Sequence, residues 1–243
     1  MDMPIAGGSV AEKVASVCRR IAGAAERAGR DPAAVRLVAV TKTFGTDQID
    51  EVLAAGVNDI GENRVQEAVA KAHAVHATAR WHLIGHLQTN KAGRAAALFD
   101  VVHSIDGLRV AQALSARRPH TMRDLDVLIE VELTGIAGHT GARPEELASL
   151  VTAVARMERL RLRGLMTMAP PGPQPQGARP VFAQLRRLGD EVRERTGEDL
   201  PELSMGMSDD FEVAIEEGST MVRIGRAIFG ERPLTVAAAQ ALP

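Results

Sequence analysis

The chain alternates short apolar runs with longer amphipathic segments, and this alternation is its most regular feature. The apolar runs are rich in β-branched residues and are typical of buried strands, whereas the segments between them carry apolar residues at helical spacing. The predicted strands are residues 36–41, 57–60, 81–84, 100–103, 126–132, 161–166, 202–204 and 221–224. The predicted helices are residues 9–28, 47–55, 64–77, 107–116, 144–157, 177–195 and 209–216.

This order of elements predicts an α/β fold of the (β/α)8 barrel type, in which every parallel strand is followed by a helix. The helix at 9–28 precedes the first strand, so we expect an extra N-terminal helix, within segment 1–35, that packs on the barrel. We expect one domain over 1–233 and a loose C-terminal tail over 234–243. An open doubly wound sheet is the alternative, but no Gly-x-Gly-x-x-Gly motif follows the first predicted strand.

Composition excludes several classes of function. The 243 residues carry a net charge of −2 and only 2% aromatic residues, which gives no electrostatic or stacking surface for nucleic acid. No apolar stretch approaches membrane-spanning length, and the N-terminus lacks the order of a signal peptide. We therefore expect a cytoplasmic protein without nucleic-acid or membrane partners, and, since nothing indicates an obligate interface, a monomer.

The only cysteine, Cys18, excludes an intrachain disulfide. It falls beside Val14, Val17 and Ile21 on one face of the first predicted helix. We interpret it as a small buried apolar residue and not as a nucleophile.

Lys42 is the most informative candidate for chemistry, because it ends an apolar strand. Side chains alternate between the two faces of a strand, so Val38, Val40 and Lys42 share a face. Desolvation at the end of such a column lowers the pKa of a lysine and makes it a nucleophile toward carbonyl groups. Taken alone, the same lysine is also compatible with an ordinary strand end that reaches solvent.

The last two predicted strands bring further polar groups to the same rim. In a barrel the first and eighth strands are neighbours, so Lys42 is expected beside Arg223. Barrels often bind phosphate in the loops after strands seven and eight. Gly206 and Gly225 permit close backbone approach there, and Ser208 supplies a hydroxyl near the start of a helix. A plain helix cap at Ser208 and a salt bridge at Arg223 are the alternatives.

A nucleophilic lysine beside a phosphate site and an arginine indicates pyridoxal 5′-phosphate. The lysine would bind the aldehyde and the arginine would face the pyridine nitrogen. Arginine stays cationic and cannot accept a proton, so the ring nitrogen is expected to remain unprotonated. An unprotonated ring is a weaker electron sink, which argues against demanding carbanion chemistry.

Seven sequence blocks occur in one order that resembles the pyridoxal phosphate homeostasis protein family, whose members are single-domain relatives of the alanine racemase barrel. They are VAVTK at 38–42, GENRVQE at 61–67, WHLIGHLQTNK at 81–91, SID at 104–106, GLM at 164–166, LSMGMSDDF at 203–211 and VRIGRAIFG at 222–230. The resemblance covers residues 36–232, which is nearly the whole predicted barrel.

The resemblance implies a function and a set of cofactor-binding residues. It implies a protein that buffers and delivers pyridoxal 5′-phosphate, with apo enzymes that depend on this cofactor as partners. The implied cofactor-binding residues are Lys42 (the covalent Schiff base), Asn63, Ser208, Arg223, Ile224, Gly225 and Arg226. One block departs from the family, because His139 stands where relatives usually carry a lysine. A role for a second lysine in handing on the cofactor is therefore in doubt.

The main alternative is a pyridoxal phosphate-dependent amino-acid racemase or lyase of the same barrel type. Racemases of this type use a lysine on one face of the substrate carbon and a tyrosine on the other. This chain has no tyrosine, and the predicted barrel leaves no room for the second β domain of such enzymes. Both observations favour a carrier without dedicated turnover. A barrel enzyme that uses Lys42 on phosphorylated substrates is a third hypothesis.

Two further features have less weight. His82 and His86 have the spacing of zinc ligands, but no glutamate follows His82 as in zinc protease motifs. The Pro-rich segment 169–175 follows the sixth predicted strand, and we interpret it as an ordinary surface loop, with a lid over the site as the alternative.

Overall fold

The computed structural model describes residues 8–75, 77–136, 138–170, 172 and 174–230. Eight parallel strands follow one another around a closed barrel, and β8 pairs with β1 to close it. The strands are β1 (Arg36–Val40), β2 (Asp59–Glu62), β3 (Arg80–Leu83), β4 (Val101–Ile105), β5 (Leu125–Glu130), β6 (Leu160–Met166), β7 (Glu202–Ser204) and β8 (Met221–Ile224). The predicted (β/α)8 barrel is confirmed.

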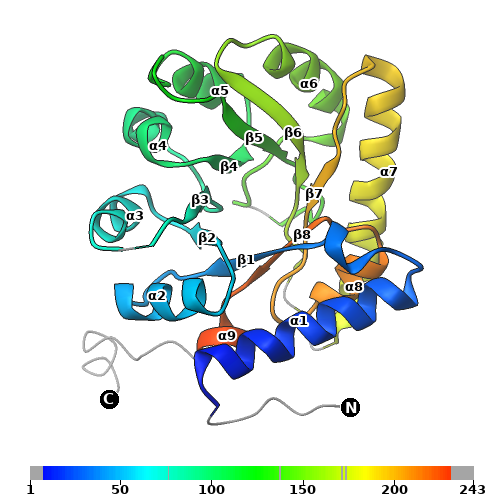
Figure 1. The fold of residues 1–243 in the computed structure, drawn as a ribbon. Helices are drawn as coiled ribbons and strands as arrows, with labels where there is room; N and C mark the ends of the chain where they lie inside the picture. Colours follow the sequence, from blue (N-terminus) through cyan, green and yellow to red (C-terminus); the bar gives the residue numbers. More distant parts are fainter. Residues whose placement is uncertain (1–7, 76, 137, 171, 173, 231–243) are drawn as a thin grey trace, which may run out of the picture.

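Helices surround the barrel (Figure 1). They are α1 (Val10–Arg27), α2 (Thr46–Ala54), α3 (Val65–Ala72), α4 (Ala92–Leu98), α5 (Leu108–Ser115), α6 (Leu147–Ala155), α7 (Arg179–Thr196), α8 (Phe211–Glu216) and α9 (Arg226–Phe229). Single turns of 3₁₀ helix form η1 (Pro32–Ala34), η2 (Thr89–Lys91), η3 (Pro144–Glu146) and η4 (Pro175–Ala178). The sequence pattern did not predict α4 or α9, and it placed the start of α8 two residues early. In the part of the chain that the structure describes, no helix is both long and apolar enough to cross a membrane.

The N-terminal helix α1 lies alongside α8 and α9 (Figure 1). Ser9 and Glu12 begin it with reciprocal side-chain to backbone hydrogen bonds, which satisfy donors that a helix start leaves open. Val14, Val17 and Ile21 form its buried face, and Arg20 bridges to Glu212 of α8 at 3.2 Å.

The prediction for Cys18 was wrong, because its side chain is exposed. The buried stripe of α1 runs through Val14, Val17 and Ile21 and continues to Ala24 and Ala25. Cys18 lies at the edge of that stripe, where the partner helices no longer cover it. An i to i+4 relation to Val14 was therefore not enough to bury it.

Side-chain alternation divides the core into two parts. The larger part fills the space between the strands and the helices, with Leu37, Ile60 and Val222 among its members. A smaller apolar cluster fills the barrel itself, formed by Val38, Val101, Leu128, Met166 and Met221. Buried polar side chains such as His82, His103 and Arg223 occupy other inward positions.

Two predicted segments fall wholly or partly outside the described residues. The barrel boundary at 233 and the tail 234–243 lie outside them, and so do residues 171 and 173 of the Pro-rich segment. The rest of that segment follows β6 and leads into η4, as its position in the sequence predicted.

Candidate functional site

Lys42 lies in the turn that leaves β1 at the carboxyl end of the barrel. The strand ends at Val40, and Lys42 is half-buried in the connection to α2. Thr41 keeps the turn tied to the barrel, because its N–H donates to the carbonyl of Gly61 at 3.0 Å. The residue after Lys42, Thr43, has a φ of 69°, which is unusual for a residue with a side chain. The turn therefore holds a specific and unfavourable backbone shape next to the candidate lysine.

A cluster of charged residues, Lys71, Glu62 and Glu67, contacts this turn, and sequence reasoning missed it. Lys71 of α3 donates from Nζ to the carbonyl of Thr41 at 2.8 Å and to Glu62 Oε1 at 2.7 Å. Lys71 also donates to Glu67 Oε1 at 2.6 Å, and the same oxygen accepts from the backbone N–H of Thr43 at 2.7 Å. The backbone on both sides of Lys42 is thus fixed by one lysine and one carboxylate of α3.

The end of β8 lies beside this turn, as the predicted neighbourhood of the first and eighth strands requires. Ala39 of β1 pairs with Ile224 of β8. A Cβ atom on Gly225 would lie 3.2 Å from the carbonyl oxygen of Val40, so only glycine permits this approach without adjustment. Beyond the strands, the rings of Phe44 and Phe229 stack at 4.8 Å between centroids. The β1–α2 turn and α9 therefore form one packed unit.

Ser208, Gly206 and the start of α9 form the candidate phosphate cradle. Gly206 has a φ of 96°, and a Cβ atom there would lie 2.6 Å from the Cβ of Ala214. Ser208 is not the N-cap of α8, which begins only at Phe211 after Asp210. Its Oγ instead accepts the N–H of Ala227 at 3.2 Å, which links the loop after β7 to α9. Ser208 therefore does not cap α8, the helix predicted to begin beside it, and bonds instead at the start of α9.

The three residues predicted after Arg223 differ in what they can offer. The side chain of Ile224 is buried on the outer face of β8, so only its backbone can contact a ligand inside the rim. Arg226 is exposed and forms an ion pair with Asp209 across the rim. Gly225, between them, lies against Val40 at the end of β1.

Arg223 points into the barrel from β8 and is 4% exposed. It donates from Nη1 to Ser204 Oγ at 2.6 Å and from Nη2 to the carbonyl of Thr167 at 2.9 Å. Burial lowers the pKa of the guanidinium to about 10, while the charges of Glu130 and Asp210 act in the opposite direction. Arg223 is therefore a cation at neutral pH, and its orientation is fixed by two acceptors.

Glu130 ends β5 beside Arg223 and is 3% exposed. Burial raises the pKa of its carboxyl group to about 7, although the positive charge of Arg223 opposes this shift. Its Oε2 accepts a long hydrogen bond of 3.4 Å from Thr140. Sequence reasoning missed this residue, whose only signal is a carboxylate at the end of an apolar strand.

Asn63 and His139 take different positions on the rim. Asn63 follows β2 and is half-buried, and its carbonyl packs against Gly85, where a Cβ atom would lie only 2.3 Å away. His139 is exposed in the loop after β5, 3.1 Å from the hydroxyl of Thr134. Asn63 therefore shares the rim with Lys42, as predicted, whereas His139 stands in an outer loop.

The histidines spaced like zinc ligands do not converge. His82 is fully buried inside the barrel and bonds to Asp59 at 2.7 Å, whereas His86 is on the rim, 3.3 Å from Asp106. Within the described ranges, no three His, Cys, Asp or Glu side chains are arranged to hold a metal ion.

Comparison with known proteins defines the class to which this barrel and rim belong. Residues 15–233 match the family model of the alanine racemase N-terminal domain. The chain is 45% identical to the pyridoxal phosphate homeostasis protein of Pseudomonas aeruginosa over 92% of this chain and 96% of that protein. It is 42% identical to the protein of that name in Escherichia coli K12, over 92% of this chain and 97% of the relative.

A solved structure shows the same likeness. PipY of Synechococcus elongatus, determined with pyridoxal phosphate bound, superposes with a TM-score of 0.80 at 35% identity, over 91% of this chain and all of that chain. The protein is an alanine racemase-type barrel. Within that class, the chain belongs to the pyridoxal phosphate homeostasis protein family.

Proposed function

We propose that this protein binds pyridoxal 5′-phosphate at the carboxyl rim of its barrel and serves in the intracellular homeostasis of that cofactor. The single observation that carries the proposal is the juxtaposition of the Lys42 turn with β8, which presents Arg223 to the barrel interior. The names of the relatives and the ligand of PipY point to the same cofactor.

The groups on the rim fit the chemistry of this cofactor. Its phosphate is an anion, and the loops after β7 and β8 offer the Ser208 hydroxyl and close backbone approach at Gly206 and Gly225. Its aldehyde requires an amine, and Lys42 is the lysine on the turn beside β8. Its pyridine nitrogen is an acceptor, and Arg223 is a donor-only group. We infer that Asn63, Ile224 and Arg226 line the same site, Ile224 through its backbone.

When bound, the cofactor supplies an aldehyde for covalent attachment to an amine and a ring that can withdraw electrons. Lys42 is the proposed attachment point, and Lys71, Glu67 and Thr41 hold its turn. Arg223 is cationic, because its pKa remains about 10 despite complete burial. A carboxylate beside the ring nitrogen would stabilise the protonated nitrogen, whereas a cationic arginine cannot. The ring nitrogen is therefore expected to stay unprotonated, and the ring to be a weak electron sink.

This electrostatic arrangement favours a carrier over an enzyme. An amino-acid racemase or lyase of the same barrel type is the second candidate, and the match to the alanine racemase N-terminal domain favours it. A two-base racemase requires a second proton donor opposite the lysine, and the chain has no tyrosine to fill that role. We propose that the protein has no dedicated turnover and that cytoplasmic apo enzymes receive the cofactor from a monomeric carrier.

The test is the absorbance spectrum of the purified protein before and after borohydride reduction, followed by mapping of the labelled peptide. A covalent link to Lys42 should give a reducible chromophore, and Lys42→Ala should abolish it while circular dichroism remains unchanged. Lys91→Ala is the matched control, because Lys91 lies in η2 after β3 and should keep the wild-type spectrum. A reducible chromophore that survives in Lys42→Ala would overturn the attachment point.

The same experiment separates the pyridoxal hypotheses from the third one. A barrel enzyme that uses Lys42 on phosphorylated sugars would show no chromophore, and borohydride would trap the sugar instead. That result would replace the proposed function.

A further inference from the structure

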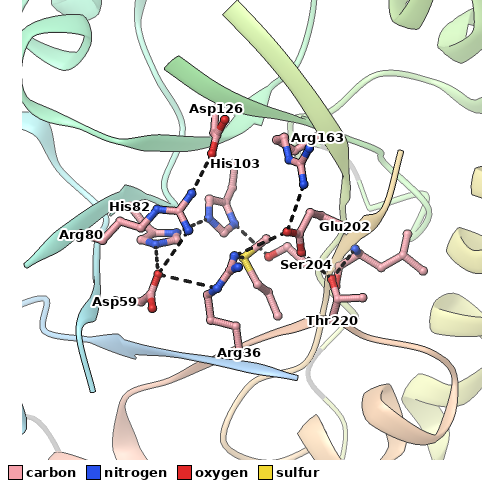
Figure 2. A network of polar contacts seen from close by, with 12 residues as sticks. Arg36, Asp59, Arg80, His82, His103, Asp126, Arg163, Glu202, Ser204 and Thr220 are labelled. Carbon is pink, nitrogen blue, oxygen red and sulfur yellow. Dashed lines mark hydrogen bonds and ion pairs between the residues drawn. The ribbon is translucent and has the colours of Figure 1, made fainter. Parts of the chain in front are cut away.

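A row of hydrogen-bonded polar side chains crosses the interior of the barrel from one mouth to the other, and the proposed function uses only its last member, Arg223. It begins at Asp59, the first residue of β2, and continues through His82 of β3, His103 of β4 and Ser204 of β7 to Arg223. Figure 2 shows His82, His103 and Ser204 in a row across the barrel interior, from left to right. His82, His103 and Ser204 are all 0% exposed.

Four short contacts connect the chain. His82 Nε2 lies 2.7 Å from Asp59 Oδ1, and His82 Nδ1 lies 2.9 Å from His103 Nε2. His103 Nδ1 lies 2.9 Å from Ser204 Oγ, which accepts from Arg223 Nη1 at 2.6 Å. Each of the four ring nitrogens of the two histidines therefore has one hydrogen-bond partner. Both rings are buried, so water cannot replace a hydrogen bond that is lost.

The two ends of the chain determine the direction of every hydrogen bond in it. Arg223 can only donate, so Ser204 must accept from it, and the Ser204 hydroxyl proton is then free to point to His103. At the other end an ionised carboxylate can only accept, so His82 must carry its proton on Nε2. The pKa of Asp59 is lowered by its hydrogen bond to His82 and by Arg36 and Arg80, in spite of burial, so this carboxylate is ionised.

The proton between the two histidines is fixed by the same reasoning. With His82 protonated on Nε2, its Nδ1 is an acceptor, and His103 must donate from Nε2. His103 Nδ1 is then the acceptor for Ser204. A second proton on either ring could be accommodated only if Ser204 Oγ accepted from both Arg223 and His103, and the Ser204 hydroxyl proton would then lose His103 as its acceptor. Burial lowers the pKa of both histidines, and the charges of Arg80 and Arg36 add to this, whereas the hydrogen bond and charge of Asp59 oppose it at His82. The net shift is downward for both rings, so we expect both to be neutral at neutral pH.

We propose that His82, His103 and Ser204 are positioning residues for Arg223. They form one hydrogen-bonded chain with a single set of proton positions, and this chain holds the guanidinium of Arg223 toward the cofactor ring. The proposal rests on the proposed function, because it needs the pyridine nitrogen to face Arg223. An arginine side chain has many rotamers, and Ser204 and the carbonyl of Thr167 remove that freedom before the ligand arrives. The chain ties this orientation to the charge of Asp59 at the opposite mouth of the barrel.

The first test reads the proton positions in the cofactor-free protein. Two-bond ¹H–¹⁵N correlation spectra of the histidine side chains distinguish the two neutral tautomers and the cation. Variants in which the other histidines are replaced one at a time by glutamine assign the signals by elimination. We expect His82 and His103 both to carry their proton on Nε2 at neutral pH. A proton on Nδ1 of either ring, or a cationic ring, would overturn the chain.

The second test separates positioning from simple structural support. Ser204→Ala should weaken binding of pyridoxal 5′-phosphate about tenfold, the factor that corresponds to one net hydrogen bond. It should leave unchanged the binding of a carbocyclic analogue whose ring nitrogen is replaced by CH. Ser219→Ala is the matched control, since Ser219 is also 0% exposed and donates only to backbone carbonyls. It should bind both ligands as the wild type does.

The outcomes also distinguish this inference from the proposed function. An equal loss for both ligands in Ser204→Ala would mean that Ser204 supports the fold and does not position Arg223, which overturns the inference alone. A wild-type protein that binds neither ligand would overturn the proposed function, and the positioning role with it. The tautomers would still show whether the hydrogen-bonded chain exists.

Discussion

At the scale of single residues, Glu130 combines deep burial with a neighbouring cation. Its pKa rises from 4.5 to about 7 because burial outweighs the attraction of Arg223. The folded protein therefore binds more protons than the unfolded chain between these two values. A raised carboxyl pKa contributes stability that is complete below about pH 4.5 and is lost as the pH rises through about 7.

Glu130→Gln should reveal this contribution, because glutamine resembles the protonated acid and cannot ionise. In the cofactor-free protein we expect equal stability of variant and wild type near pH 4, below the pKa of the unfolded chain. Near pH 8 the variant should be more stable, by at most about 3 kcal/mol for a pKa shift of this size. Urea unfolding across this pH range measures the difference. A difference that does not change with pH would show that Glu130 is ionised in the folded protein throughout.

Ser208 should contribute to affinity through its hydroxyl, which lies between the loop after β7 and α9. Its oxygen accepts from Ala227, so its proton is available to an anion. Ser208→Ala should weaken binding of pyridoxal 5′-phosphate by about 1–2 kcal/mol, the usual size of one charge-assisted hydrogen bond. Titration followed by absorbance measures this, with Ser149→Ala of α6 as the control. Pyridoxal without its phosphate should bind poorly, and equal affinity for both vitamers would refute the phosphate cradle.

At the scale of elements, a buried ion pair between Lys71 and Glu62 connects α3 to β2. Lys71 and Glu62 meet at 2.7 Å, with side-chain exposures of 10% and 0%. Burial raises the pKa of Glu62, and Lys71 and Thr41 counteract this by hydrogen bonding. Its other carboxylate oxygen, Oε2, is buried with no hydrogen-bond partner among the described residues. Glu62 therefore depends on Lys71 for most of its compensation.

Removal of Lys71 alone should consequently be costly. Lys71→Met should lower the free energy of unfolding by about 3–5 kcal/mol, since it leaves a buried carboxylate without its cation. The double variant Lys71→Met, Glu62→Gln should recover much of this loss, because the buried carboxylate is removed and only the partly exposed Glu67 still lacks its cation. Urea unfolding at pH 7 measures both. The double variant should remain as unstable as the single one if the ion pair is not the cause.

Some elements were predictable from the sequence and others were not, for physical reasons. The strands are short apolar runs, and the long helices α1 and α7 carry apolar residues at helical spacing, so both types are specified by the sequence. Helix α4 was missed because only alanines form its buried face, so no contrast of large apolar and polar residues marks it. Helix α9 is a single turn, which has no period to detect.

The site was predictable to the extent that strand ends determine it. The order of the strands along the sequence is sufficient to place Lys42, Arg223 and Ser208 on one rim. Lys71, Glu62 and the His82–His103 pair were missed because each is polar at a buried position, and only tertiary contacts show which polar partner compensates it. The only signal of these residues in the sequence is a polar residue within or next to an apolar segment.

At the scale of the whole molecule, racemisation would require two groups on opposite faces of the substrate carbon. In the proposed site Lys42 would supply the amine on one side, and the chain holds no tyrosine among its 243 residues to act on the other. Arg223, whose pKa is about 10, would leave the ring nitrogen unprotonated in the proposed site, so the ring would stabilise a carbanion poorly. The whole barrel is therefore expected to hold the cofactor without turning over amino acids at an enzymatic rate.

The measurement is incubation of the pyridoxal-loaded protein with L-alanine in deuterated buffer, with deuterium at Cα and the D-isomer followed together. Loss of one general acid–base group typically reduces a rate by about 10²–10⁴-fold, so D-alanine should form far more slowly than in a racemase. Slow exchange with retained configuration is the expected result, since Lys42 can return a proton only to the face from which it came. Lys42→Ala, loaded in the same way, is the control and should show no exchange above that of free cofactor. Formation of D-alanine at roughly 1–10³ per second, the ordinary range of enzymes, would reinstate the racemase and end the carrier hypothesis.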